Sequence, residues 1–323
     1  MTRGGGSVAA VAAIDCGTNS TRLLVATNEG LALERVNRIT RLGEGVDRTG
    51  RLGRDGIRRT ISALEEFRLV IERHQAAMIR ITATSAARDA SNRDEFFDAA
   101  EAVVGERPEL LGGVEEGRLS FWGAVSSLGE VDGPWLVVDI GGGSTELIVG
   151  SGLQEGPAGV HSMDVGCVRL TERFLASDPP TKAQLDAARH LVAAEIATAV
   201  EAVPQLGMAN GMIGLAGTVA CLAAVDQGID GTDRERLHHH RLSRRHVDEI
   251  GERLAAMPAR WRSTVPGVED GRADVIVGGT IVLSEVMARF GFDECLTSEA
   301  DILDGLAASL VTAKANPPGP ACA

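Results

Sequence analysis

The sequence repeats one pattern, first as Asp15-Cys16-Gly17-Thr18-Asn19-Ser20-Thr21-Arg22-Leu23-Leu24-Val25 and again as Asp139-Ile140-Gly141-Gly142-Gly143-Ser144-Thr145-Glu146-Leu147-Ile148-Val149. The two copies share Asp, Gly, Ser, Thr, Leu and Val in register. An apolar run precedes each Asp and another follows each small-residue turn, which predicts a strand, a tight turn and a second strand in both places. The chain is therefore expected to contain two related hairpins whose turns face one cleft.

The turns of these hairpins have the composition of phosphate-binding loops. Glycine and small polar residues let successive backbone N–H groups approach an anion, so each turn can cradle phosphate oxygens. The Asp that ends each first strand can hold a hydrated Mg²⁺ ion, whose coordination is usually completed by substrate phosphates. The phosphate-binding candidates are Gly17, Thr18, Asn19 and Ser20 in the first copy and Gly141, Gly142, Gly143, Ser144 and Thr145 in the second.

The two copies differ at one position that matters chemically. Glu146 follows the second turn at the place where the first copy has Arg22, so only the second copy offers a carboxylate there to bind metal or position water. We therefore expect the metal and the attacking water to lie on the side of Asp139. The expected metal ligands are Asp15, Asp139 and Glu146, with Mg²⁺ as the ion and Mn²⁺ as an alternative.

Length and composition fit a two-domain enzyme. The chain has 323 residues, more than one hydrophobic core usually serves, and its 44% hydrophobic and 24% charged content is ordinary for a globular protein. No run of about 18 apolar residues occurs, so no membrane span is expected. The net charge of −13 disfavours a nucleic-acid binder held by charge. Five scattered cysteines favour a reducing cytoplasm, and Cys16 is expected to be a small buried side chain.

A basic segment, residues 234–262, stands out from the acidic remainder of the chain. Arginine can grip phosphate with two N–H groups, so this segment suits a polyanionic substrate. A solvated helix face is an equally good interpretation. The segment also carries His238, His239 and His240, but no partner ligands stand at helical spacing, so a metal site is not expected there.

Helix and strand patterns alternate around the two hairpins. The expected elements are helices over 55–74, 92–104, 115–128, 181–203, 272–290 and 301–315, and strands over 78–83 and 212–215. Asn92 with Glu95, and Thr181 with Gln184, are expected to form capping boxes. Gly217-Thr218 adds two phosphate-binding candidates between a strand and a helix, and residues 316–320 are expected to form a disordered tail. This order predicts an α/β protein with two similar domains flanking a ligand-binding cleft.

At this level of detail the chain resembles the exopolyphosphatase and guanosine pentaphosphate phosphohydrolase family, within the superfamily of sugar kinases, heat-shock chaperones and actin. The resemblance covers residues from about 13 to 310 and implies two actin-like (ribonuclease H-like) α/β domains. We expect residues 1–121 with 299–323 in the first domain and 122–298 in the second, with a hinge near Trp122. The resemblance rests on motifs at residues 13–20, 41–45, 83–90, 115–119, 139–146 and 165–172, in that order.

The resemblance implies Mg²⁺-dependent removal of terminal phosphate from inorganic polyphosphate. The same reaction on guanosine pentaphosphate, a nucleotide of the stringent response, is the alternative. The second Glu of the family's Glu-Glu pair is the catalytic base, and it corresponds to Glu116 here. Asp139 and Glu146 complete the expected catalytic set, Arg88 is expected to reach phosphate, and Arg169 is a weaker candidate. The expected form is a cytoplasmic homodimer without nucleic-acid or membrane partners.

The chain departs from the family pattern near the end of the second domain. The family often has Gly-Leu-Arg-Glu-Gly there, whereas residues 300–305 are Ala300-Asp301-Ile302-Leu303-Asp304-Gly305, without the Arg. We also expect a short, two-domain form without the extra C-terminal domain of longer relatives. Two functions of other classes stay open: a sugar or acetate kinase of the same superfamily, and a non-catalytic sensor that binds guanosine tetraphosphate or pentaphosphate.

Overall fold

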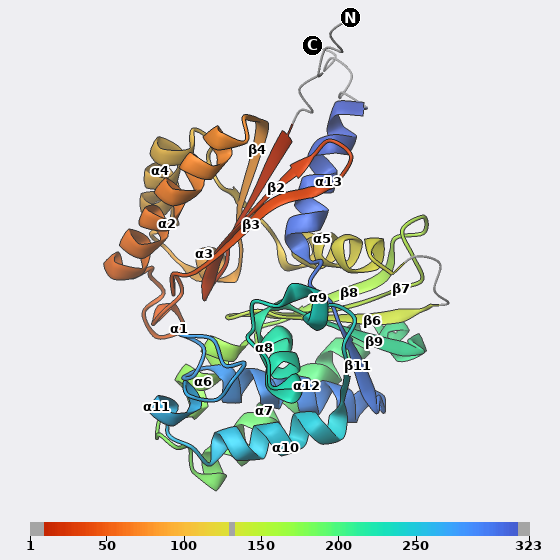
Figure 1. Cartoon of the computed structure of the whole chain (residues 1–323). Coiled ribbons are helices and arrows are strands. Elements are labelled where there is room, and N and C mark those ends of the chain that lie inside the picture. The colour runs from red at the N-terminus through yellow and green to blue at the C-terminus, as the bar shows by residue number, and fades with distance from the viewer. Residues whose placement is uncertain (1–9, 129–132, 316–323) are drawn as a thin grey trace, which may run out of the picture.

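The first predicted hairpin forms the middle of a five-stranded mixed sheet in the upper half of Figure 1. The computed structural model describes residues 10–128 and 133–315. In this sheet β1 pairs antiparallel with β2 and parallel with β4. The strand order is β3-β2-β1-β4-β5, built from β1 (Ala10–Cys16), β2 (Ser20–Thr27), β3 (Ala32–Ile39), β4 (Ala76–Ala83) and β5 (Glu109–Leu110).

Successive residues of β1 point to opposite faces of the sheet, so both faces are apolar and helices cover both. Ile14 packs in one core with Phe67 and Phe96, whereas Val11 packs in another with Leu306. Figure 1 accordingly shows α2 and α4 on one side of the sheet and α13 on the other. We call this sheet and its helices the first half; the helices are α1 (Val46–Thr49), α2 (Arg54–Arg73), α3 (Ser85–Asp89), α4 (Arg93–Val104) and α13 (Ile302–Ala315).

The second hairpin occupies the same place in a second sheet, which lies below the first in Figure 1. Its strand order is β10-β11-β9-β6-β7-β8, so β8-β7-β6-β9-β11 repeats the order of the first sheet. The strands are β6 (Trp135–Ile140), β7 (Thr145–Gly150), β8 (Pro157–Met163), β9 (Gly211–Leu215), β10 (Arg241–Ser243) and β11 (Glu294–Thr297). The repeated order confirms the prediction of two similar α/β units.

One face of the second sheet is covered by the largest core of the protein, where Val138 and Leu147 pack with Val192, Ile196 and Val282. We call this sheet and its helices the second half. The helices are α6 (Cys167–Phe174), α7 (Lys182–Ala202), the 3₁₀ helix η1 (Pro204–Met208), α8 (Ala216–Gln227), α9 (Arg234–Leu237), α10 (Arg244–Ala255), α11 (Ala259–Arg262) and α12 (Ile276–Phe290).

Helix α5 (Gly113–Ser126) belongs to the cores of both halves. Leu119 packs with α13 against the first sheet, while Phe121 packs against Ile148 of the second sheet. The helix therefore lies between the two sheets, as Figure 1 shows. The expected domain boundary at 121/122 and the hinge near Trp122 fall inside this continuous helix; the division stays a prediction.

Two local expectations are wrong and one is confirmed. Helix α4 begins where expected, but Asn92 forms no cap, because its Oδ1 accepts the N–H of Leu52 at 2.8 Å instead. Helix α12 begins at Ile276 rather than at residue 272, after turns that bury Arg272. At α7 the expected capping box is present, since Thr181 Oγ1 accepts the N–H of Gln184. The expected tail at 316–320 lies outside the described residues.

Candidate active site

The two hairpin turns have the same internal geometry and meet at the junction of the halves. Gly17 N–H donates to the carbonyl of Ser20 and Gly141 N–H to that of Ser144, both at 3.0 Å. A Cβ on Gly142 would lie 2.8 Å from Cβ of Thr18, so only glycine allows the two loops to approach this closely. The predicted facing of the two loops is therefore seen in the structure.

The loop carbonyls are turned toward the protein rather than into the cleft. In the first loop, Thr18 O and Asn19 O accept N–H groups from residues 40–43. In the second, Gly142 O accepts the N–H of Val168 at 2.8 Å, and Gly143 O accepts Nε of Arg169 at 2.7 Å. Within the described residues the N–H groups of Gly142 and Gly143 have no acceptor. This arrangement suits the binding of an anion by N–H groups.

The cleft between the loops is narrow and encloses about 60 Å³. That volume holds only a few water molecules. The predicted site residues that line it are Asp15, Gly17, Thr18, Asn19, Ser20, Glu116, Asp139, Gly141, Gly142, Gly143, Ser144 and Gly217.

Four predicted residues stand behind this lining. Thr145 Oγ1 donates to the carbonyl of Val165 at 2.6 Å and is fully buried. Thr218 packs against α12, where a Cβ on Gly279 would collide with its side chain. These two threonines are not placed for direct phosphate contact, which corrects that expectation. Arg88 and Glu146 also lie behind the lining; Arg88 bonds the lining residues Glu116 and Ser144, and Glu146 stands opposite Asp139 in the hairpin.

Glu116 lies in the first turn of α5 and is only 9% exposed. Arg88 Nη1 donates to Glu116 Oε2 at 2.6 Å and to the carbonyl of Leu111 at 3.0 Å. Burial raises the pKa of Glu116 to about 7, although the Arg88 guanidinium opposes that rise. A carboxylate with a pKa near 7 can accept a proton at neutral pH, as a general base must.

Asp139 and Glu146 are direct cross-strand partners in the second hairpin. Burial raises the pKa of Asp139 to about 6, against an opposing hydrogen bond from Ser120. Burial also raises the pKa of Glu146 well above its ordinary value, and the charges of Glu116 and Asp139 raise it further. Carboxylates held this way repel one another, so a cation among them would be favourable.

The equivalent pair in the first hairpin is Asp15 with Arg22. Arg22 Nη2 bonds Asp15 Oδ2 at 2.7 Å, and Nη1 of the same guanidinium pairs with Asp301. Asp301 belongs to the segment in which the chain lacks the family's Arg. Asp301 lines the cavity that adjoins the cleft, and from there it holds Arg22.

The carboxylates fit a divalent cation only in part. The described residues contain no cluster of three or more His, Cys, Asp or Glu side chains arranged to hold a metal ion, so the expected trio of Asp15, Asp139 and Glu146 is not gathered as a complete ligand set. Asp15 is already neutralised by Arg22, yet its Oδ1 is buried without a hydrogen-bond partner. The donor set of one or two carboxylates is what Mg²⁺ uses when phosphates and water supply the remaining ligands.

Arg272 lines the cleft and was not predicted from the sequence. Its side chain is 9% exposed, and Nε donates to Glu269 Oε2 at 2.5 Å. The guanidinium lies directly against Gly217, where any Cβ would collide with it. Residue 272 was expected to be the first residue of a helix. It lies instead in a turn that directs its side chain into the cleft, and no sequence pattern predicted that turn.

Arg169 joins the two halves beside the loops. Its Nη1 bonds Asp47 Oδ1 at 3.1 Å, and its Nη2 pairs with Asp89 and bonds Ser85 Oγ at 3.2 Å. Arg173, one turn later, donates from Nε to Asp47 Oδ2 at 2.6 Å. Arginines of the second half thus hold carboxylates of the first half, and these ion pairs join the halves beside the cleft.

The basic segment 234–262 is engaged in ion pairs rather than presented as one free cationic surface. Arg234 pairs with Glu299, Arg241 with Glu294, and the buried Arg262 with Asp178. The segment forms α9, β10, α10 and α11, and these ion pairs favour the solvated helix face over a surface for a polyanion. Among the described residues, His238, His239 and His240 belong to no group of three or more side chains that could hold a metal ion.

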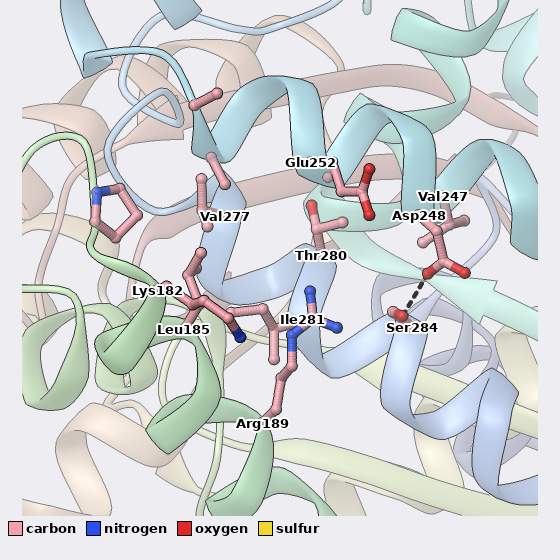
Figure 2. Close-up of a pocket in the computed structure, with 14 residues that line it drawn as sticks. Lys182, Leu185, Arg189, Val247, Asp248, Glu252, Val277, Thr280, Ile281 and Ser284 are labelled. Carbon is pink, nitrogen blue, oxygen red and sulfur yellow. Dashed lines mark hydrogen bonds between the residues drawn. The ribbon is translucent and has the colours of Figure 1, made fainter.

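Other cavities lie outside the loops. One, of about 450 Å³, adjoins the cleft and shares Arg22, Gly217 and Arg272 with it. Another, of about 260 Å³, lies between α7, α10 and α12 (Figure 2). In Figure 2 its wall carries the Ser284–Asp248 hydrogen bond of 2.6 Å. No predicted site residue lines this second cavity.

Two glycine-rich loops face each other at the junction of two α/β halves, with the buried carboxylate of Glu116 beside them. The chain belongs to the Ppx/GppA phosphatase family, whose pattern it matches over residues 24–313. It is 44% identical over 316 residues to Exopolyphosphatase 2 of Mycobacterium tuberculosis, which covers 93% of this chain and 98% of the relative. This confirms the family resemblance, the enzyme class and the α/β fold.

Solved structures agree with the family assignment. The structure of an exopolyphosphatase-like protein superposes with a TM-score of 0.89 at 38% identity, covering 94% of this chain and 99% of that one. The Ppx/GppA member from Aquifex aeolicus superposes with a TM-score of 0.78 at 30% identity, covering 95% and 99%. Separately, none of the helices within the described residues is both long and apolar enough to cross a membrane.

Proposed function

We propose that this protein is an exopolyphosphatase, which hydrolyses the terminal phosphate of inorganic polyphosphate with Glu116 as general base. The observation that carries the proposal is the position of Glu116, a buried carboxylate with a pKa of about 7 beside two phosphate loops. The family membership and the 44% identity to an exopolyphosphatase support it. Phosphoryl transfer depends mostly on positioning and charge stabilisation, which these loops are suited to supply.

In this proposal the N–H groups of Gly142 and Gly143 hold the terminal phosphate. Glu116 orients a water molecule and accepts its proton while the water oxygen bonds to phosphorus and the bridging P–O bond breaks. Orthophosphate leaves together with a chain one unit shorter. Arg88 keeps the Glu116 carboxylate oriented, since its guanidinium bonds both Glu116 and Ser144 Oγ.

Mg²⁺ would be held by Asp139 and Glu146 and would neutralise charge on the phosphate oxygens. Both carboxylates are buried, and each receives a hydrogen bond that leaves its second oxygen without one among the described residues. Asp15, which Arg22 neutralises, is the weaker ligand. The homodimer, the cytoplasmic location and the domain boundaries stay predictions.

Guanosine pentaphosphate is a second candidate substrate, favoured by the 450 Å³ cavity beside the cleft. Arg35, Arg234 and Arg272 line it, but each is paired with a carboxylate, so the cavity is balanced in charge. A cavity without excess positive charge suits a nucleoside better than a further run of phosphates. A kinase would use the same cavity for its nucleotide.

The test is orthophosphate release, with Mg²⁺, from long polyphosphate, short polyphosphate and guanosine pentaphosphate, in parallel for the wild type and Glu116→Gln. Release that collapses in the variant supports the hydrolase, and the ranking of substrates separates the two candidates. Transfer of phosphate from ATP to an added acceptor would point to the kinase. Nucleotide binding without turnover would point to the sensor.

A further inference from the structure

The second hairpin holds its two carboxylates side by side at a cost in stability, because like charges on directly opposite residues of an antiparallel pair repel. Asp139 lies opposite Glu146, and Glu146 lies opposite Ser162 on the next strand. Ser162 Oγ donates to Glu146 Oε1 at 2.8 Å. The strand neighbour of Glu146 therefore orients its carboxylate.

Asp139 receives its hydrogen bond from outside the sheet. Ser120 Oγ donates to Asp139 Oδ2 at 2.6 Å, and the serine is completely buried. Ser120 belongs to α5 and stands four residues after Glu116, so both side chains lie on one face of the helix. One helical face thus carries the proposed base and a donor to the neighbouring carboxylate.

Glycines on α5 make this contact possible. A Cβ on Gly117 would lie 2.7 Å from Cγ1 of Val160 and 3.2 Å from Cγ1 of Ile148, and a Cβ on Gly113 would collide with Ser162. Without these glycines α5 could not lie directly on β7 and β8. The close approach brings a short side chain such as serine within reach of Asp139.

We infer that Ser120 is a positioning residue, which fixes the Asp139 carboxylate so that its free oxygen is presented to a divalent cation. The inference rests on the proposed function only in naming that cation as the enzyme's metal. A hydroxyl bound to one carboxylate oxygen restricts rotation of the group, and such outer partners orient metal ligands. Ser120 itself touches neither substrate nor metal.

The test measures Mn²⁺ binding to the full chain by calorimetry, with and without orthophosphate, in the absence of any polymeric substrate. Ser120→Ala should weaken Mn²⁺ binding about 10- to 100-fold, the usual effect of losing such a partner. Ser120→Thr restores a hydroxyl and should recover most of the affinity. Melting temperature and circular dichroism establish that each variant is folded.

Ser126→Ala is the matched control, because Ser126 lies on the same helix and its Oγ donates only to the backbone carbonyl of Gly123, at 2.7 Å. It should leave Mn²⁺ affinity unchanged. The inference is overturned if Ser120→Ala binds Mn²⁺ as the wild type does, if Ser126→Ala weakens binding equally, or if the wild type binds no Mn²⁺ under either condition. A wild type that binds Mn²⁺ with this dependence on Ser120 but releases no orthophosphate would remove the proposed function and keep the inference.

Discussion

Arg88 bonds Glu116 through Nη1 at 2.6 Å and Ser144 Oγ through Nη2 at 3.3 Å, so one guanidinium ties the proposed base to the second phosphate loop. Burial alone would lower the pKa of Arg88, but the Glu116 carboxylate raises it above its ordinary value. The arginine is therefore a permanent cation between the base and the loop. Its planar, two-sided geometry is what a lysine cannot reproduce.

Arg88→Lys should lower kcat by about 10²-fold, because a lysine keeps the charge but cannot orient Glu116 and Ser144 together. Steady-state kinetics with polyphosphate measures the loss. Arg118→Lys is the control, since Arg118 is exposed on α5 and should retain full activity. Wild-type kcat in Arg88→Lys would show that charge alone suffices at this position.

Glu116→Gln should lower kcat by roughly 10²–10⁴-fold while KM changes little, because glutamine cannot accept the proton from water. The neighbouring Glu115 is exposed, so Glu115→Gln provides a control that differs by one position along the same helix. Single-turnover orthophosphate release gives the chemical rate directly. Near wild-type turnover in Glu116→Gln would exclude Glu116 as the base.

The stability of the metal-free protein should fall as pH rises through neutrality. The folded-state pKa of Glu116 is raised from 4.5 to about 7, so its contribution is fully present below pH 4.5 and is lost as pH rises through 7. Glu116→Gln removes this dependence. The unfolding free energy of the wild type relative to the variant should therefore drop by roughly 2–3 kcal/mol between about pH 5 and pH 8.

Urea denaturation at several pH values, with a chelator present, measures that difference. A relative stability that stays constant with pH, or that rises with pH, would contradict the raised pKa. Saturating Mg²⁺ should reduce the drop, because a cation favours the ionised carboxylates.

Asp47→Asn should weaken the ion-paired contact between the two halves. Asp47 accepts hydrogen bonds from Arg169 and Arg173, and its pKa is lowered chiefly by the hydrogen bond from Arg173. Losing these charge-assisted bonds should cost about 1–3 kcal/mol of unfolding free energy. Small-angle X-ray scattering should show a larger radius of gyration.

Asp55→Asn is the control for that experiment. Asp55 pairs with Arg58 on the surface of α2, where both side chains are at least 70% exposed, so little stability depends on the pair. If the two variants behave alike in scattering and denaturation, Asp47 does not hold the halves together.

The sequence predicted the two hairpins well because the repeat places the same residue types at the same spacing, and local turn chemistry determines a hairpin. Glu116 could be assigned only by family resemblance, since a glutamate in a helix has no local signal for burial. Arg272 was missed as a site residue because it reaches the cleft only through tertiary packing, which no local pattern marks. The cap at Asn92 failed for the same reason, since Leu52, distant in sequence, takes its side-chain oxygen.

The two hairpins differ in the residue that stands opposite their Asp. Arg22 stands opposite Asp15 in the first hairpin, and Glu146 stands opposite Asp139 in the second. In the first hairpin the Arg22 guanidinium is the counter-ion of Asp15, so its charge is neutralised by the chain itself and does not depend on ions in solution. In the second hairpin a carboxylate, Glu146, stands at that position, so the chain supplies no cation there. If Mg²⁺ binds at the second hairpin as proposed, activity should follow Mg²⁺ concentration as the occupancy of one ion rather than two.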